Sequence, residues 1–218
     1  MPANESAMIK ECGDEDMEAG RGPGQLGWYS FATRFVHGKT VLDAGCGLAK
    51  GLDILKSAAL QAQGQDLDPR LKRPDIVIGE LKNLASKSFD ILTSIDVVEH
   101  VKDPHQYLSD LARIARQGFF ITTPNWSVSR CQWPYHLREY TPREFFELLS
   151  PFGRVLLFKG IENSKEFAAI PVEYRRLYFY FNDFRTVPAV GLAVRCFNRL
   201  LPRNCRIYGH NAAWVSWD

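Results

Sequence analysis

The alternation of short apolar runs with amphipathic runs constrains the fold of this 218-residue chain more than any other feature of its sequence. Apolar residues at helical spacing predict helices over the ranges 28–36, 48–60, 103–116 and 141–153. Between them, short apolar runs predict strands within 39–47, 62–69, 74–81, 88–101, 118–125, 154–161 and 212–217. We therefore expect an α/β fold built on a doubly wound, mostly parallel sheet of seven strands.

Residues 25–218 are expected to form one domain, because a chain of this length can bury one substantial core. Residues 1–24 are acidic and contain several glycines, which predicts a flexible tail. A net charge of +2 does not favour a nucleic-acid binder. No apolar run reaches the roughly 18 residues of a transmembrane helix, and the first residues do not resemble a secretory signal.

The cysteines are scattered and odd in number, and none is part of a Cys-x-x-Cys pair. This pattern is typical of reduced thiols, so we expect a cytoplasmic protein.

One segment, residues 172–206, interrupts the alternation and is predicted to be a helical insertion near the C-terminus. It holds seven arginines, seven aromatic residues and only two acids, Glu173 and Asp183. Three interpretations stay open: a helical hairpin packed on the domain, a lid over the substrate, or an interfacial helix that brings the protein to a membrane surface.

A glycine-rich turn follows the first predicted strand in the sequence "VLDAGCGLAKG". Asp43, Gly45 and Gly47 lie at this strand-to-helix turn, where glycine lets a ligand approach the backbone and the helix offers free N–H groups. Asp66 ends the next strand and Glu80 follows the third. Carboxylates there can accept hydrogen bonds from ribose hydroxyls, and ligands of such sheets bind beyond the carboxyl ends of the strands.

These motifs, "VLDAGCG", "GQDLDP", "GEL" and "FDILTSIDVVEHV" in this order, resemble the class I S-adenosylmethionine-dependent methyltransferases over roughly residues 28–160. The resemblance implies a Rossmann-like fold and an S-adenosylmethionine site. Its cofactor-binding residues would be Asp43, Gly45, Gly47, Asp66, Leu67, Glu80, Leu81 and Ile95. Ala49 stands where many members have a third glycine, and it could keep the close approach only with a negative φ.

The second half of the chain is similar to a narrower group, methyltransferases of types 11 and 23. "DVVEHV", "ITTPN" and "HLREYTPREF" resemble the O-methyltransferases of ubiquinone biosynthesis and the 2′-O-methyltransferases of small-RNA 3′ ends. In the RNA enzymes a Glu-x-x-Glu-His stretch and a later histidine bind a divalent metal. Here Asp96 replaces the first glutamate, and the set would be Asp96, Glu99, His100 and His136.

The residues themselves also favour a metal site. Asp96, Glu99 and His100 are spaced i, i+3 and i+4, so on one helical turn they would share a face. His136, in the loop after the fifth strand, returns to the same sheet edge. Two carboxylates and two imidazoles suit Zn²⁺, Mn²⁺, Fe²⁺ or Co²⁺ better than Mg²⁺.

Two other readings of these residues remain open. In one, His100 or His136 is a general base that acts without a metal, and Glu99 supports the cofactor loop. In the other, all of these residues have purely structural roles. His37, His105 and His210 are interpreted as surface or satisfied histidines, without a role.

The sequence predicts an O-methyltransferase that transfers a methyl group to a hydroxyl of a small molecule, glycan or lipid-linked acceptor, with metal assistance on a vicinal diol or catechol. One alternative is an RNA ribose 2′-O-methyltransferase, although nucleic acid is the weaker choice of partner. The other is a non-catalytic protein that binds S-adenosylmethionine.

Overall fold

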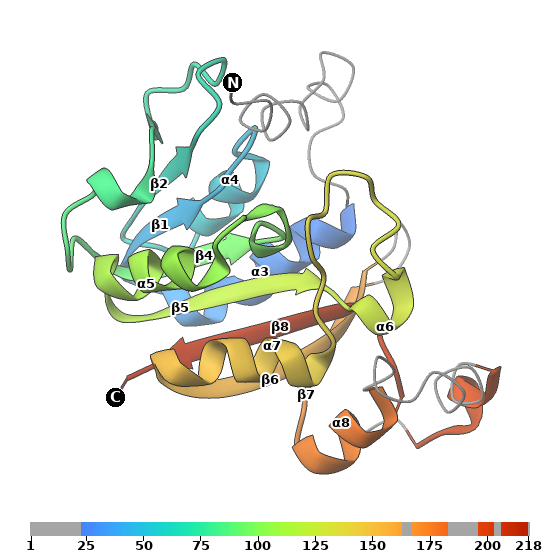
Figure 1. Cartoon of the computed structure of the whole chain (residues 1–218). Coiled ribbons are helices and arrows are strands. Elements are labelled where there is room, and N and C mark those ends of the chain that lie inside the picture. The colour runs from blue at the N-terminus through green and yellow to red at the C-terminus, as the bar shows by residue number, and fades with distance from the viewer. Residues whose placement is uncertain (1–22, 163–166, 183–195, 203–205, 218) are drawn as a thin grey trace.

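The sheet has eight strands in the computed structural model, which describes residues 23–162, 167–182, 196–202 and 206–217 (Figure 1). The strand order is β3-β2-β1-β4-β5-β8-β6-β7. The strands are β1 (Thr40–Ala44), β2 (Gln61–Asp66), β3 (Ile76–Ile78), β4 (Phe89–Ile95), β5 (Ala115–Pro124), β6 (Arg154–Glu162), β7 (Phe167–Pro171) and β8 (His210–Ser216). The five strands from β3 to β5 are parallel to one another, whereas β8, β6 and β7 add antiparallel pairs.

The order of strands reverses next to β1, which pairs with β2 on one side and β4 on the other. A crevice forms at such a switch point because the connections leave the two neighbouring strands in opposite directions. The loops that follow β1, β2 and β4 therefore lie together at the carboxyl edge of the sheet.

Helices cover both faces of the sheet, as the α/β pattern predicted (Figure 1). On one face, α3 (Pro23–Val36) and α4 (Lys50–Lys56) bury Trp28 and Leu52 against the strands. On the other, α5 (Pro104–Ile114) and α7 (Pro142–Leu149) bury Leu111 and Phe145. Removing such apolar surface from water contributes roughly 25 cal/mol per Å².

Local signals set where α5 and α7 begin. The Asp103 side chain accepts a hydrogen bond from the Gln106 N–H at 2.9 Å, with proline at the first helical position. At α7, Thr141 and Glu144 exchange side-chain-to-backbone hydrogen bonds in a capping box. Both helices thus begin where the sequence predicted, with their caps at residues 103 and 141.

Three predictions about elements need correction. The sheet has eight strands, not seven, because Phe167–Pro171 forms the short edge strand β7 next to β6. The helix expected over 48–60 extends only from Lys50 to Lys56, and a turn follows it. Helix α3 begins at Pro23, inside the range assigned to the tail; residues 1–22 lie outside the described residues.

The insertion follows β7 and precedes β8, where the sequence predicted it. Its described parts are α8 (Arg175–Asn182), a 3₁₀ helix (Asn198–Leu200) and a stretch without regular secondary structure from residue 206. Lys159 of β6, fully buried, holds these parts to the sheet: its ammonium lies 4.6 Å from the centre of the Tyr178 ring and 5.1 Å from that of Tyr208. A helical hairpin is not tested, because residues 183–195 and 203–205 lie outside the described ranges. No helix in the described part of the chain is long and apolar enough to cross a membrane.

Candidate active site

The glycine turn after β1 is a loop with left-handed backbone and open space above it. Gly45 and Gly47 have φ values of +71° and +52°, a region that glycine adopts without a Cβ clash. A Cβ on Gly45 would lie 2.6 Å from Val97, whereas one on Gly47 would meet no atom within 4 Å. The Gly47 N–H donates to Asp66 Oδ2 at 2.8 Å, which ties the loop to the end of β2. The open side of this loop fits a ligand that approaches the backbone.

Asp43 lies beneath this loop and is fully buried. Its two carboxylate oxygens accept hydrogen bonds from the hydroxyls of Tyr29, at 3.0 Å, and Thr93, at 2.7 Å. These bonds anchor α3 and β4 to the strand that carries the loop. Contact between Asp43 and a cofactor stays a prediction.

The other predicted cofactor residues lie along the same edge with different exposures. Asp66 is half-buried at the end of β2, and Leu67 beside it is 45% exposed. Glu80 is exposed and lies 2.5 Å from the Lys82 ammonium. The side chains of Leu81 and Ile95 are buried in the two cores. A carboxylate with an exposed apolar neighbour is a fitting environment for a ribose and its base.

Ala49, at the start of α4, does not have the negative φ that a close approach of the ligand was expected to require. Its φ is +59°, in the left-handed region, and its side chain is fully buried. The chain thus keeps the backbone conformation that favours glycine while it carries a methyl group there.

Three of the four predicted metal ligands, Glu99, His100 and His136, converge in the structure, and Asp96 is not part of this group. Asp96 has a φ of +53°, Val97 has φ and ψ of −129° and −42°, outside the α-helical region, and Val98–His100 forms a 3₁₀ helix. The three polar residues therefore do not share one α-helical turn.

The Asp96 carboxylate is instead part of a second cluster that links three elements. It accepts hydrogen bonds from Thr122 Oγ1 at 2.6 Å and from Gln25 Nε2 at 3.1 Å, and His210 Nε2 lies 3.5 Å away. His210, which the sequence left without a role, packs near Trp28 at the start of β8. His210 is the first residue of β8 and pairs with Pro124 at the end of β5, and this place at the carboxyl edge was the signal that could have revealed it.

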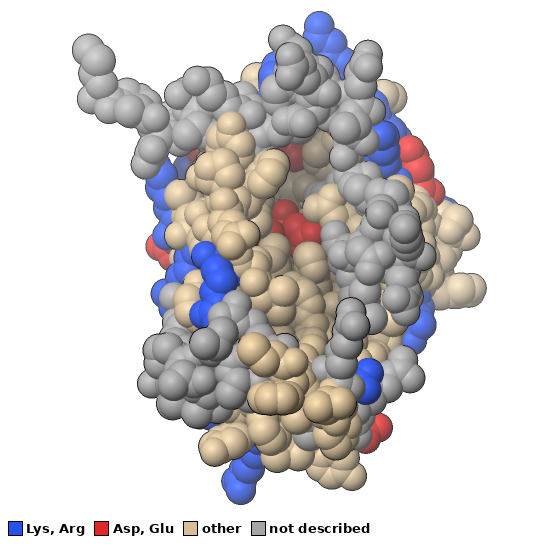
Figure 2. Space-filling view, turned by 90° about the vertical axis from the view of Figure 1, so that its right-hand side faces the viewer, with Lys and Arg blue, Asp and Glu red and all other residues tan. Residues whose placement is uncertain are grey.

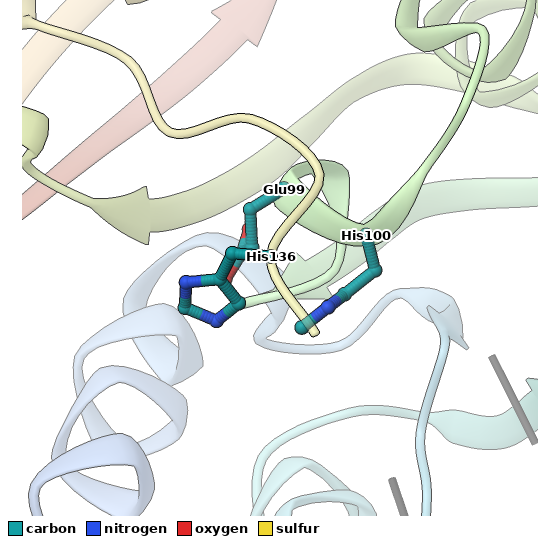
Figure 3. A group of neighbouring side chains, drawn as sticks. All are labelled: Glu99, His100 and His136. Carbon is teal, nitrogen blue, oxygen red and sulfur yellow. The ribbon is translucent and has the colours of Figure 1, made fainter. Parts of the chain in front are cut away.

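Glu99, His100 and His136 converge at the carboxyl edge, with one ligand atom from each within 4.8 Å of the others (Figure 3). The imidazole rings of His100 and His136 lie 4.7 Å apart. His100 Nδ1 is 3.1 Å from the Tyr135 carbonyl oxygen, and His136 Nδ1 is 2.6 Å from Glu139 Oε1. Each Nδ1–H therefore donates, which leaves the lone pair of each imidazole on Nε2.

Glu99 is the buried member of the cluster. Its Oε2 accepts a hydrogen bond from Thr123 at 3.0 Å, but Oε1 is buried and has no hydrogen-bond partner among the described residues. Burial, and then the charge of Asp96, raise the pKa of Glu99 well above its usual range. A buried carboxylate oxygen without a partner calls for a cation or a proton.

Glu139 holds the His136 side of the cluster in place, and the sequence analysis did not single it out. It is buried, and besides His136 it accepts hydrogen bonds from Ser129 and from the Cys131 N–H. Burial acts to raise its pKa, but these hydrogen bonds prevail and the pKa of Glu139 lies below its usual value. The spacing His-x-x-Glu was visible in "HLRE" and could have revealed it.

An open hollow reaches this edge of the molecule. Figure 2 shows acidic side chains at its floor, uncharged side chains around it, and Lys and Arg at the margin. The arrangement can hold a divalent cation on one carboxylate and two neutral imidazoles, a donor set typical of Zn²⁺, Mn²⁺, Fe²⁺ or Co²⁺. With Glu99 protonated and no cation, it offers instead an imidazole as a general base.

Comparison with known proteins agrees with this architecture. Residues 42–122 match a family model described as a methyltransferase domain. A probable S-adenosylmethionine-dependent methyltransferase of Mycolicibacterium smegmatis is 35% identical over 133 residues, 53% of this chain and 52% of that protein. A ubiquinone biosynthesis O-methyltransferase of Idiomarina loihiensis is 31% identical over 127 residues, 49% of this chain and 51% of that protein. The chain thus spans about half the length of the curated relatives it matches.

Among solved structures, one chain of the complex between the Haloferax volcanii Trm112 methyltransferase activator and a methyltransferase superposes with a TM-score of 0.62. It is 18% identical, over 99% of this chain and 96% of that chain, and this likeness concerns the fold alone. The sheet order and these matches show a Rossmann-like fold similar to that of S-adenosylmethionine-dependent methyltransferases. The match over residues 42–122 agrees with the family that the sequence motifs predicted.

Proposed function

We propose that the protein is an S-adenosylmethionine-dependent O-methyltransferase whose acceptor hydroxyl lies beside Glu99, His100 and His136. One observation carries the proposal: a buried carboxylate oxygen without a partner faces two imidazoles at the edge where the glycine turn lies.

S-adenosylmethionine supplies an electrophilic methyl group on a sulfonium. The residues proposed to hold it are those of the glycine turn and of the ends of β2 and β3. The loop backbone at Gly45 and Gly47 would lie against its amino-acid end, and Asp66 would accept hydrogen bonds from its ribose hydroxyls. Glu80, with the side chain of Leu67 and the backbone of Leu81 and Ile95, would border the adenine.

A divalent metal, if bound, would lower the pKa of a coordinated hydroxyl and orient its oxygen. The proposed ligands are three: Glu99, His100 and His136. The chain prepares them for this role, because Tyr135 and Glu139 accept hydrogen bonds from the Nδ1–H groups and so leave both Nε2 lone pairs for a metal. Asp96 is not among the ligands, since Thr122, Gln25 and His210 surround its carboxylate.

The acceptor is proposed to be a vicinal diol or catechol on a small molecule or glycan, because two neighbouring oxygens can share one cation. The name of the Idiomarina loihiensis relative, a ubiquinone biosynthesis O-methyltransferase, supports oxygen as the methylated atom. The same experiment tests the two alternatives, an RNA ribose 2′-O-methyltransferase and a non-catalytic protein that binds S-adenosylmethionine.

The experiment measures methyl transfer from labelled S-adenosylmethionine to catechols, diol-containing glycans, nucleosides and RNA with a free 3′ end. Metal content is measured on the same preparation. Glu99→Ala and His136→Ala should each lower turnover by about 100-fold or more, as expected when several kcal/mol of charge stabilisation are lost. His105→Ala, an exposed histidine on α5, is the matched control and should retain full activity.

Three results would each overturn a part of this proposal. Transfer only to RNA would exclude the small-molecule acceptor. A metal-free protein that ignores chelators and added Zn²⁺ or Mn²⁺ would leave an imidazole as a plain general base. Cofactor binding without transfer to any acceptor would leave a binding protein.

A further inference from the structure

The loop that carries His136 has an inner and an outer side. Its inner side holds the cluster through the Tyr135 carbonyl and Glu139. On its outer side, Trp133 is 54% exposed and Leu137 54% exposed, and the ring of Tyr135 lies 6.0 Å from that of Trp133. Large apolar side chains therefore surround the approach to the candidate active site.

Helix α8 presents a second exposed apolar stripe. Tyr174, Leu177 and Tyr180, spaced three residues apart at the start of and along the helix, are 61%, 45% and 67% exposed. The opposite side of the helix carries Tyr178 and Asn182, which are buried against the domain. The exposed side thus combines these large apolar side chains with Arg175 and Arg176, whereas an ordinary surface helix keeps mainly polar residues in water.

The two stretches contact each other at one end only. The Ser127 hydroxyl of α6 (Trp126–Ser129) donates to the Asn182 carbonyl at the end of α8. Figure 1 draws the loop after α6 at the upper right and helix α8 at the lower right, both toward the side that Figure 2 shows face-on with the hollow in it. Phe197 and Leu200, 59% and 80% exposed, add to the apolar surface of the insertion.

The charges beside these side chains are mainly positive. Residues 126–138 contain Arg130 and Arg138 and no acid, and residues 172–182 contain Arg175 and Arg176 against Glu173. Aromatic and aliphatic side chains interleaved with arginines are the composition of segments that lie in the headgroup region of anionic membranes.

We infer that this face, formed by residues 126–138 and 172–182 and called here the aromatic face, docks on an anionic lipid bilayer. Trp133, Leu177 and Tyr180 would enter the headgroup region, while the arginines would lie among the lipid phosphates. The hollow beside the His136 loop would then open toward the membrane, so that an amphipathic acceptor could enter without leaving the lipid. The inference about docking does not depend on the proposed methyl transfer.

Vesicle sedimentation tests the inference with the full chain. Wild type should sediment with vesicles of phosphatidylglycerol and phosphatidylcholine, and much less with phosphatidylcholine alone. High salt should weaken sedimentation, because charges are screened within about 10 Å at 0.1 M salt. Trp133→Ala combined with Leu177→Ala should lower partitioning at least about 10-fold, as expected from losing the burial of two large apolar side chains.

Leu60→Ala provides the matched control, because Leu60 is 75% exposed at the amino-terminal edge of the sheet, before β2. This variant should bind vesicles like wild type. Brominated lipids should quench tryptophan fluorescence in wild type and less in Trp133→Phe, a readout that needs no acceptor. Absence of sedimentation, or equal loss in Leu60→Ala, would overturn the inference. So would concentration-dependent dimers that the double variant abolishes, since a second copy would then cover the face.

Discussion

At the scale of single residues, one backbone angle decides which carboxylate joins which cluster. Asp96 adopts a left-handed φ of +53°, a conformation that costs a non-glycine residue of order 1–2 kcal/mol. Thr122 offsets this cost, because it accepts a hydrogen bond from the Asp96 N–H and donates one to its carboxylate. Each such bond contributes about 0.5–1.5 kcal/mol. The turn thereby sends Asp96 toward His210 and leaves Glu99 with the two histidines.

Asp66 carries a prediction at the same scale. Asp66→Ala should weaken the binding of S-adenosylhomocysteine about 10–150-fold, which corresponds to losing roughly 1.5–3 kcal/mol of charge-assisted hydrogen bonding. The variant also loses the bond from the Gly47 N–H, so both effects act in the same direction. Isothermal titration calorimetry measures the change. Asp53→Ala, on the exposed side of α4, should bind normally, and unchanged affinity in a folded Asp66→Ala would remove Asp66 from the site.

At the scale of elements, a network of charges joins α4 to the loop before β3. Arg73 makes two hydrogen bonds to Asp53 of α4 and two to Asp75, and Lys56 also contacts Asp75. The hydrogen bonds from Arg73, and then from Lys56, hold the pKa of Asp75 below its usual range. Bidentate geometry makes this network worth more than an isolated surface pair.

Asp75→Asn tests the network through its dependence on pH. Because the pKa is depressed in the folded state, Asp75 stabilises the fold at pH values above its ordinary pKa of about 4, and this contribution is lost as the pH falls further. At pH 7 the variant should melt about 1–4 °C lower, as expected for roughly 0.5–1 kcal/mol in a chain of this size. Melting curves between pH 7 and 2 should show the difference narrowing in acid. A difference in melting temperature between wild type and Asp75→Asn that stays constant with pH would mean that the shape of the Asp75 side chain, and not its charge, stabilises the fold.

At the scale of the whole molecule, the sheet order places the proposed cofactor site and the proposed metal site at the same edge of the sheet but after different strands. The glycine turn and Asp66 follow β1 and β2, on one side of the switch point. Glu99 and His100 follow β4, on its other side, and His136 belongs to the loop after β5. The two sites can therefore lose their ligands independently.

Reciprocal variants test this independence. Glu99→Ala should change the affinity for S-adenosylhomocysteine by less than about 3-fold, because a residue outside the cofactor loop removes none of its hydrogen bonds. Asp66→Ala should in turn leave bound metal unchanged. Calorimetry measures the first quantity and elemental analysis the second. Cofactor binding that collapses in Glu99→Ala would show that both groups occupy one coupled site.

Much of the framework followed from the sequence alone, because its signals act over a few residues. Apolar periodicity placed the strands and helices, and Asp103 and Thr141 marked two helix starts that the structure confirms. The alternation of strands and helices also implied a shared carboxyl edge, which brings the glycine turn and the polar residues after β4 together. Strand β7 was missed because its five residues show neither alternation nor a turn signal that separates them from a loop.

The membership of the candidate site was decided only by tertiary structure. Spacing grouped Asp96 with Glu99 and His100, but spacing assumes a regular helix, and a left-handed residue breaks that regularity. Glu139 orients His136, and His210 meets Asp96, through contacts between segments remote in sequence. Local sequence determined which elements form and where their polar ends lie. Packing between distant elements determined which of those polar groups meet, because side-chain direction depends on backbone angles and neighbours that no short stretch specifies.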